Sequence, residues 1–294
     1  MNNDNLAFLL ENLKYLGFGE QPGLYDQLRE VITQEPTEFQ LETEYYFEEQ
    51  CKLETILYFR RSNRSDLYFF NRYEARLYYP DDQDRNRQQT FYISKGRGVT
   101  FKEAFNLLQG RAVYKRLISK DGDPYYAWIQ LNFEEKDLNQ NYRTRQYYPG
   151  YGYDLEKLLE RYPIRELQLP QLRENLLKSL RKGNMATVSF TKPHKVEKML
   201  IEACPQFKTI TIYRPAIKPA EDLADHSKME WEKVPAEADS GDEILWDNEE
   251  EHAGPEGLNY AEEGGDEGAD PEMKGSSPEK TVAKKRATPK KISL

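Results

Sequence analysis

A helix followed by two strand-like segments, in residues 100–133, constrains the fold of this chain more than any other feature. Thr100 and Glu103 have the spacing of a capping box, in which each side chain binds the backbone amide of the other residue. Apolar residues cover most of the short helix that follows, so that helix must be buried. Gly110 ends it, and two strand-like segments follow around a polar turn at residues 120–123. The pattern predicts a buried helix that joins a strand-rich half of the chain to a mixed half.

The half before this helix has the pattern of a helix-flanked antiparallel meander. Leucines at helical spacing predict one helix over residues 6–16 and a second over residues 24–32. Strand-like segments follow at residues 38–50, 52–61, 67–79 and 89–94, and polar turns separate the last three. Strict alternation along residues 67–79 places Tyr68, Phe70, Arg72 and Arg76 on one face of the sheet.

The half after it has three strand-like segments, two helices and three more strands. The strands are expected at residues 112–118, 125–133, 142–147, 185–190, 196–202 and 209–213, and the helices begin at Asp154 and Pro170. Strands and helices do not alternate as in parallel sheets, so the fold class is α+β. We expect a first unit over residues 1–109, a second α+β unit over residues 110–216, and a disordered acidic tail with a basic C-terminus over residues 217–294.

Charge is distributed unevenly along the chain, in three blocks that differ from the units above. The net charge of −9 combines 11 acids and 2 bases in residues 1–50, 19 acids and 30 bases in residues 51–216, and 21 acids and 10 bases in residues 217–294. Such asymmetry indicates an interaction surface and a tail rather than one evenly charged globule.

Bases occur beside aromatic residues in the central segment. Arginine side chains can neutralise phosphates while exposed rings stack on unpaired bases. The candidate nucleic-acid-binding residues are Arg60, Arg61, Arg64, Tyr68, Phe70, Arg72 and Arg76. The alternative is that helices cover this face and bury its rings, with the arginines at the rim. Burial of the rings would remove the stacking platform and favour a protein-interaction role.

The acidic tail contains an apolar island in residues 242–248. Ile244, Leu245 and Trp246 form a candidate partner-binding peptide with the tryptophan as its anchor, because Trp is enriched at binding hot spots. A plain solvating extension is the alternative. A third hypothesis is that the acidic tail lies along the basic central body, residues 51–216, and competes with nucleic acid for it.

The residue inventory favours a protein that is not an enzyme. His194 is the one histidine before residue 217, and Cys51 and Cys204 are the two cysteines, so histidine-based catalysis and a four-cysteine zinc site lack their residues. We assign no catalytic residue, metal or cofactor, although a hydrolase with paired carboxylates stays open. Asp81, Asp82 and Asp84 are interpreted as a solvated loop rather than a magnesium site. No segment has the length and hydropathy of a membrane span, and no leader peptide is recognised, so we expect a cytoplasmic protein.

Several short segments resemble one family in the same order. They include residues 14–20 (KYLGFGE), 67–71 (LYFFN), 103–110 (EAFNLLQG), 151–155 (YGYDL) and 205–208 (PQFK). The series, over about residues 5–214, resembles a family of uncharacterised proteins with a domain of unknown function, common on conjugative and other mobile elements of Bacteroidota. Cys204 and the strongly acidic tail depart from that pattern.

The resemblance implies a bacterial accessory protein of a mobile element and assigns no role to any residue, because the family has no established activity. Together with the charge pattern, it predicts a non-enzymatic accessory that binds nucleic acid through the basic central body. The alternative is a protein-interaction adaptor that acts through the tail peptide around Trp246.

Overall fold

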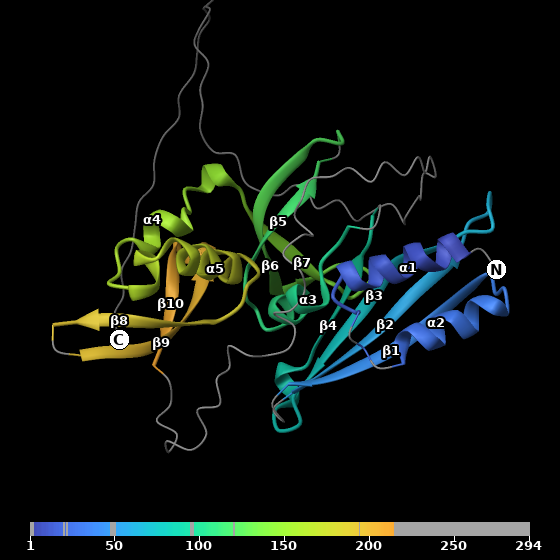
Figure 1. Cartoon of the computed structure of the whole chain (residues 1–294), viewed down its shortest axis with the longest axis horizontal. Coiled ribbons are helices and arrows are strands. Elements are labelled where there is room, and N and C mark those ends of the chain that lie inside the picture. Colours follow the sequence, from blue (N-terminus) through green and yellow to red (C-terminus); the bar gives the residue numbers. More distant parts are fainter. Residues whose placement is uncertain are drawn as a thin grey trace, which may run out of the picture. The chain divides into compact units, whose positions relative to one another are not determined.

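The computed structural model describes residues 3–214, except residues 20, 22, 48–50, 95–96, 120 and 194 (Figure 1). Its helices are α1 (Asn3–Tyr15), α2 (Leu24–Thr33), α3 (Phe101–Leu108), α4 (Leu155–Leu159) and α5 (Pro170–Arg181). Its strands are β1 (Glu38–Phe47), β2 (Cys51–Arg61), β3 (Tyr68–Tyr78), β4 (Arg87–Tyr92), β5 (Val113–Ile118), β6 (Pro124–Lys136), β7 (Tyr142–Tyr147), β8 (Ala186–Lys192), β9 (Lys195–Cys204) and β10 (Thr209–Tyr213). Four short 3-10 turns are η1 (Gln83–Arg85), η2 (Pro149–Tyr151), η3 (Arg165–Gln168) and η4 (Pro205–Phe207). These elements confirm the α+β fold class.

The first four strands form an antiparallel sheet in chain order, which confirms the predicted meander. Antiparallel neighbours need only short connections, so successive strands can pair directly. Along β2, buried residues alternate with half-buried ones from Cys51 to Phe59. Successive side chains of a strand point to opposite faces, so this alternation gives the sheet one apolar face and one solvent-facing face.

Helices α1, α2 and α3 pack against the apolar face of this sheet. Helix α1 contacts β3 and α2 contacts β1, and Figure 1 shows both helices running beside the sheet. Leu9 and Leu13 of α1 and Leu24 and Leu28 of α2 are almost completely buried. They share one core with sheet residues that include Leu41, Leu53, Leu57, Phe59, Tyr73 and Leu77.

Helix α3 is buried among β3, β4, β5 and β6, as its apolar sequence predicts. Seven of its eight residues are buried. The predicted capping box is present: the Glu103 amide donates to the Thr100 hydroxyl at 3.3 Å, and the Thr100 amide donates to the Glu103 carboxylate at 2.8 Å. On its other side, Asn106 donates to the carbonyl oxygen of Lys182 at 2.6 Å and to the side-chain oxygen of Asn184 at 2.9 Å. The helix therefore connects the first sheet to the turn after α5.

Glu103 also binds Lys115 of β5, at 2.7 Å between Nζ and Oε2, and its side chain is 9% exposed. Glu103→Ala removes both the cap and the ion pair and leaves the Lys115 ammonium partly buried, so we expect a loss of about 3 kcal/mol of unfolding free energy. Glu103→Gln keeps an oxygen for the Thr100 amide and is expected to lose about 1 kcal/mol. Urea denaturation of both variants checks this. Equal losses would show that the cap contributes nothing beyond the ion pair.

Two three-stranded antiparallel sheets make up the rest, with strand orders β5–β6–β7 and β10–β9–β8. A second core joins them to α4 and α5; it includes Trp128, Leu159, Leu180, Val188 and Ile201. The opposite side of β5–β6–β7 contributes Val113, Ile129, Leu131 and Tyr142 to the first core. The first core therefore contains side chains from beyond residue 110, and a domain boundary at that position stays a prediction.

Candidate functional site

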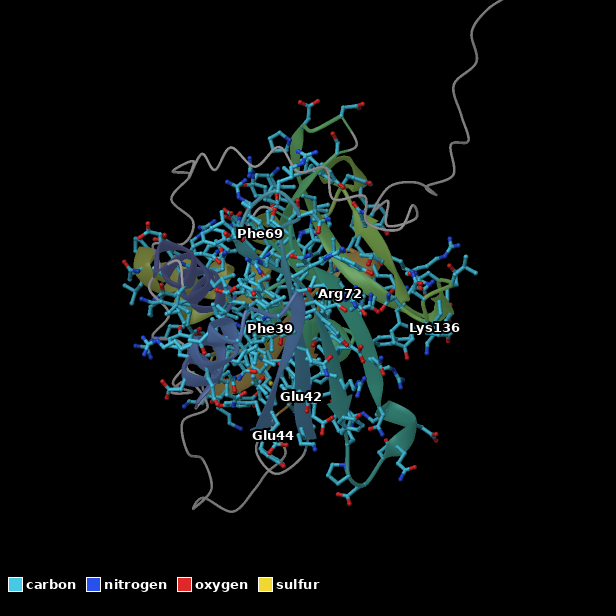
Figure 2. All side chains as sticks on the ribbon, turned by 90° about the vertical axis from the view of Figure 1, so that its right-hand side faces the viewer. Phe39, Glu42, Glu44, Phe69, Arg72 and Lys136 are labelled. Atoms are coloured by element: carbon cyan, nitrogen blue, oxygen red, sulfur yellow. The ribbon has the colours of Figure 1, made fainter. Side chains whose placement is uncertain are left out.

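The face of the first sheet that points away from α1, α2 and α3 is the candidate site. We call it the open face, because all of its side chains are exposed or half-buried. It comprises Glu38, Gln40, Glu42, Glu44 and Tyr46 of β1, Lys52, Glu54, Ile56, Tyr58 and Arg60 of β2, Arg72, Glu74, Arg76 and Tyr78 of β3, and Gln88, Thr90 and Tyr92 of β4. Figure 2 labels Glu42 and Glu44 on β1 and Arg72 on β3.

Strand register arranges these side chains in rows across the sheet. One row is Gln40, Tyr58, Arg72 and Tyr92, and the next is Glu42, Ile56, Glu74 and Thr90. The third row is Glu44, Glu54, Arg76 and Gln88, and the last is Tyr46, Lys52 and Tyr78. Tyrosines therefore stand in the first and last of these four rows, and Glu38 and Arg60 form a further pair beyond the first row.

Arg72 lies between two tyrosines in the first row. Its guanidinium carbon is 4.4 Å from the centroid of the Tyr58 ring, which is close enough for a cation–π contact. Tyr92 is the register partner of Arg72 on the other side. Strands are spaced about 4.8 Å apart, so two half-exposed rings flank one exposed guanidinium.

Arg76 belongs to a hydrogen-bonded group in the middle of the open face. Its Nε and Nη2 atoms donate to Glu74 Oε1 at 2.7 Å and 2.5 Å, and Gln88 donates to the same oxygen at 2.6 Å. The hydrogen bond to Glu74 raises the pKa of the Arg76 guanidinium. This arginine is held in place by its neighbours and still has 34% of its side chain exposed.

Lys52 is neutralised by two carboxylates. Its ammonium group binds Glu54 directly, lies 3.8 Å from Glu44, and is 5.6 Å from the centroid of the Tyr78 ring. The hydrogen bond to Glu54, and then the charges of both carboxylates, raise the pKa of Lys52. This end of the open face therefore has no excess positive charge.

Acids outnumber bases on the open face by five to four. The acids are Glu38, Glu42, Glu44, Glu54 and Glu74, and the bases are Lys52, Arg60, Arg72 and Arg76. β1 carries acids and no base, whereas the arginines belong to β2 and β3. A polyanion is therefore expected to follow β2–β4 and to avoid β1.

The predicted candidate residues divide into two groups. Arg60, Arg72 and Arg76 lie on the open face, as described above. Arg61 forms an ion pair with Asp66 at the turn after β2, and Arg64 is exposed in that turn. Arg60, Arg72 and Arg76 therefore share one face of the β2–β3 hairpin, whereas Arg61 and Arg64 lie at its turn.

Tyr68 and Phe70 require a correction. Both are buried, at 3% and 5% exposure, and Phe70 stacks on Phe59 with 4.9 Å between ring centroids. The strict alternation that placed them beside Arg72 is wrong, because Phe59 pairs with Phe70 while Tyr58 pairs with Arg72. Asn71 is the extra residue of this β-bulge, which moves every later side chain to the other face. These two rings cannot stack on a nucleic-acid base.

The tyrosines that do line the open face were largely missed from the sequence. Tyr46, Tyr58, Tyr78 and Tyr92 are absent from the candidate residues predicted from the sequence. The alternation of β2 already contained a signal, since Lys52, Glu54, Tyr58 and Arg60 fall on one face opposite an apolar set. The other strands could be placed only from the register.

The other sites considered from the sequence are either absent from the described residues or lie outside them. No group of three or more metal-binding side chains occurs in the described part of the chain. Within the same residues, no helix has the length and apolar character needed to cross a membrane. The tail peptide at Ile244, Leu245 and Trp246, the predicted disordered tail and His194 lie outside the described residues.

No protein-family model, curated protein or solved structure matches the chain. The resemblance to the mobile-element family therefore stays a prediction.

Proposed function

We propose that this protein is a non-enzymatic accessory protein that binds single-stranded nucleic acid on the open face. The row of Tyr58, Arg72 and Tyr92 carries the proposal, because it places a guanidinium between two half-exposed rings on the uncovered side of an antiparallel sheet. Rings on an open sheet stack on unpaired bases, and arginine contributes both a phosphate contact and a cation–π surface. The sequence resemblance adds the proposal that the protein serves a mobile genetic element.

The charge balance of the open face limits how this binding can work. Three arginines, at positions 60, 72 and 76, give at most about three phosphate contacts, so log K is expected to fall with log salt at a slope of about −2 for a single strand. Stacking then supplies most of the affinity. Duplex DNA hides its base faces and is expected to bind more weakly than a single strand.

Fluorescence anisotropy with labelled single-stranded and duplex oligonucleotides tests the proposal on the full chain. Tyr58→Ala and Arg72→Gln are each expected to weaken single-strand binding about tenfold, because each removes one stacking partner. Tyr126→Ala on β6, where the ring is 46% exposed, and Arg29→Gln on α2 are matched controls away from the open face. No binding by the unaltered protein at low salt would overturn the proposal.

A protein-interaction adaptor is the second candidate. The burial of Tyr68 and Phe70 favours it, because two of the rings expected to stack on bases belong to the core. Under this alternative the peptide around Trp246 binds a partner, and Trp246→Ala in the full chain abolishes capture of that partner while single-strand binding is absent. Retained capture with Trp246→Ala would remove the adaptor role of the peptide.

A further inference from the structure

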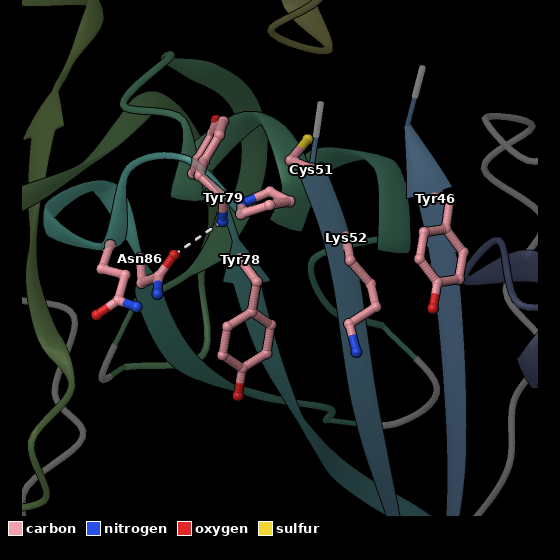
Figure 3. A pocket seen from close by; sticks show the side chains of 8 residues that line it. Tyr46, Cys51, Lys52, Tyr78, Tyr79 and Asn86 are labelled. Atoms are coloured by element: carbon pink, nitrogen blue, oxygen red, sulfur yellow. Dashed lines mark hydrogen bonds between the residues drawn. The ribbon is translucent and has the colours of Figure 1, made fainter. Parts of the chain in front are cut away.

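A hollow of about 450 Å³ lies at the end of the open face that is farthest from Arg72 (Figure 3). Its lining includes Tyr46, Lys52, Tyr78, Tyr79, Gln83 and Asn86. Small-molecule sites have volumes of about 300–1,000 Å³, with mostly apolar walls and a few polar groups. The hollow therefore has room for one small planar group.

Two of its walls are tyrosines of the last row on the open face. Tyr46 and Tyr78 are the register partners of Lys52 on its two sides, and Figure 3 shows the three side chains extending in the same direction from neighbouring strands. Tyr46 is 62% exposed. A flat ring can stack on the Tyr78 phenol, which lies between the aliphatic part of Lys52 and Asn86 in Figure 3.

Hydrogen bonds hold the polar rim of the hollow and Tyr79, whose side chain points to the other side of the sheet from Tyr78 in Figure 3. The Tyr79 hydroxyl accepts from Gln109 at 3.1 Å, and the guanidinium of Arg85 lies 4.0 Å from the Tyr79 ring centroid. The Tyr79 amide donates to Asn86 Oδ1 at 2.8 Å, which fixes the orientation of the Asn86 amide group. Its NH₂ group and the exposed Gln83 side chain then supply donors and acceptors of the kind that pair with a base edge.

The charges around the hollow favour a neutral ring over a phosphate. Glu44 and Glu54 neutralise Lys52, and Arg85 lies over the Tyr79 ring, which points away from Lys52. A phosphate placed beside Tyr78 and Lys52 would therefore meet two carboxylates and one ammonium group. Arg76 lies two residues from Tyr78 along β3, about 7 Å away, where it can reach the phosphate attached to a base in the hollow.

We infer that the hollow binds one unpaired nucleobase, stacked on Tyr78 with its polar edge toward Asn86 and Gln83. This inference rests on the proposed function and gives the strand a fixed end on the open face. Adenine is the preferred base, because asparagine and glutamine amides pair with it through two hydrogen bonds.

Calorimetric titration of the full chain with adenosine, and separately with ribose 5-phosphate, tests the inference without any oligonucleotide. Adenosine is expected to bind with a Kd of about 1 mM, as a single stacked and hydrogen-bonded ring allows, and ribose 5-phosphate is not. Tyr78→Ala and Asn86→Asp are each expected to weaken adenosine binding about tenfold. Tyr148→Ala, whose 46% exposed ring lies outside the hollow, is the control.

An oligonucleotide with one 2-aminopurine separates this inference from the proposed function. Fluorescence quenching of that base by the unaltered protein, lost in Tyr78→Ala while Arg72-dependent binding persists, supports the hollow as the base site. Oligonucleotide binding that is unchanged in Tyr78→Ala, with no adenosine binding, overturns the inference and leaves the proposed function in place. Adenosine binding that depends on Tyr78, without oligonucleotide binding, supports the inference and removes the single-strand function.

Discussion

Gly183→Ala is expected to lower the free energy of unfolding by about 4 kcal/mol, because it combines backbone strain with a steric clash. Gly183 has φ +78, a conformation that L-residues with a Cβ rarely adopt. An added Cβ would lie 2.8 Å from the Ala112 carbonyl oxygen and 3.0 Å from a methyl carbon of Val113. Ala112 directly precedes β5 and Val113 begins it, and both are buried, so neither atom can move away easily. Urea denaturation followed by circular dichroism measures the loss.

Gly122→Ala is the matched control for this prediction. Gly122 has a similar φ of +89, but an added Cβ would meet no atom within 4 Å. Gly122→Ala is therefore expected to lower the free energy of unfolding by about 1–2 kcal/mol, through backbone strain alone. If Gly183→Ala and Gly122→Ala lose the same stability, the close approach to β5 is not the reason for the glycine.

The large effect at Gly183 follows from its place between two parts of the fold. Arg111 donates to the Gly183 carbonyl oxygen at 2.8 Å, and Asn106, which is fully buried, binds the residues on either side of this glycine. A shift of the turn therefore breaks hydrogen bonds that a buried amide cannot replace with water. α3 and the turn after α5 are expected to lose their contact together.

The elements of this fold were predictable because each depends on neighbours in sequence. The capping box at Thr100, the leucine spacing of α1 and α2, and the alternation of β2 all act within a few residues, and each appears where it was expected. The meander followed from the short polar turns between strands. Local signals of this kind determine which elements form and which strands pair first.

The site was less predictable because it depends on relations between strands. Alternation along residues 67–79 contains no sign of the extra residue at Asn71, and one inserted residue exchanges the two faces for the remainder of β3. The sequence placed Arg72 and Arg76 correctly beside each other and placed Phe70 with them incorrectly. It also left open which face the helices cover, and that choice decides which tyrosines meet solvent.

Phe70→Ala is expected to lose more stability than Tyr58→Ala, and Tyr58→Ala is expected to lose more single-strand binding than Phe70→Ala. Phe70 lies in the core, stacked on Phe59 and 6.0 Å from the Phe18 ring centroid, so its truncation is expected to cost about 3–5 kcal/mol of unfolding free energy. Tyr58→Ala removes a half-exposed ring and one cation–π contact, so about 1 kcal/mol is expected. Thermal and urea denaturation of the full chain measure both losses.

The loss of single-strand binding is expected to be larger in Tyr58→Ala than in Phe70→Ala. The binding is measured at a temperature where both variants remain folded. Phe70→Ala then binds within about twofold of the unaltered protein, because its ring never reaches the open face, whereas Tyr58→Ala binds about tenfold more weakly. The opposite result would be a folded Phe70→Ala variant without binding and a Tyr58→Ala variant that still binds. The stacking rings would then have to lie on the face of the sheet that α1 and α3 cover. Strand β3 would then have to adopt a register without the bulge at Asn71, and the open face would lose its role in binding.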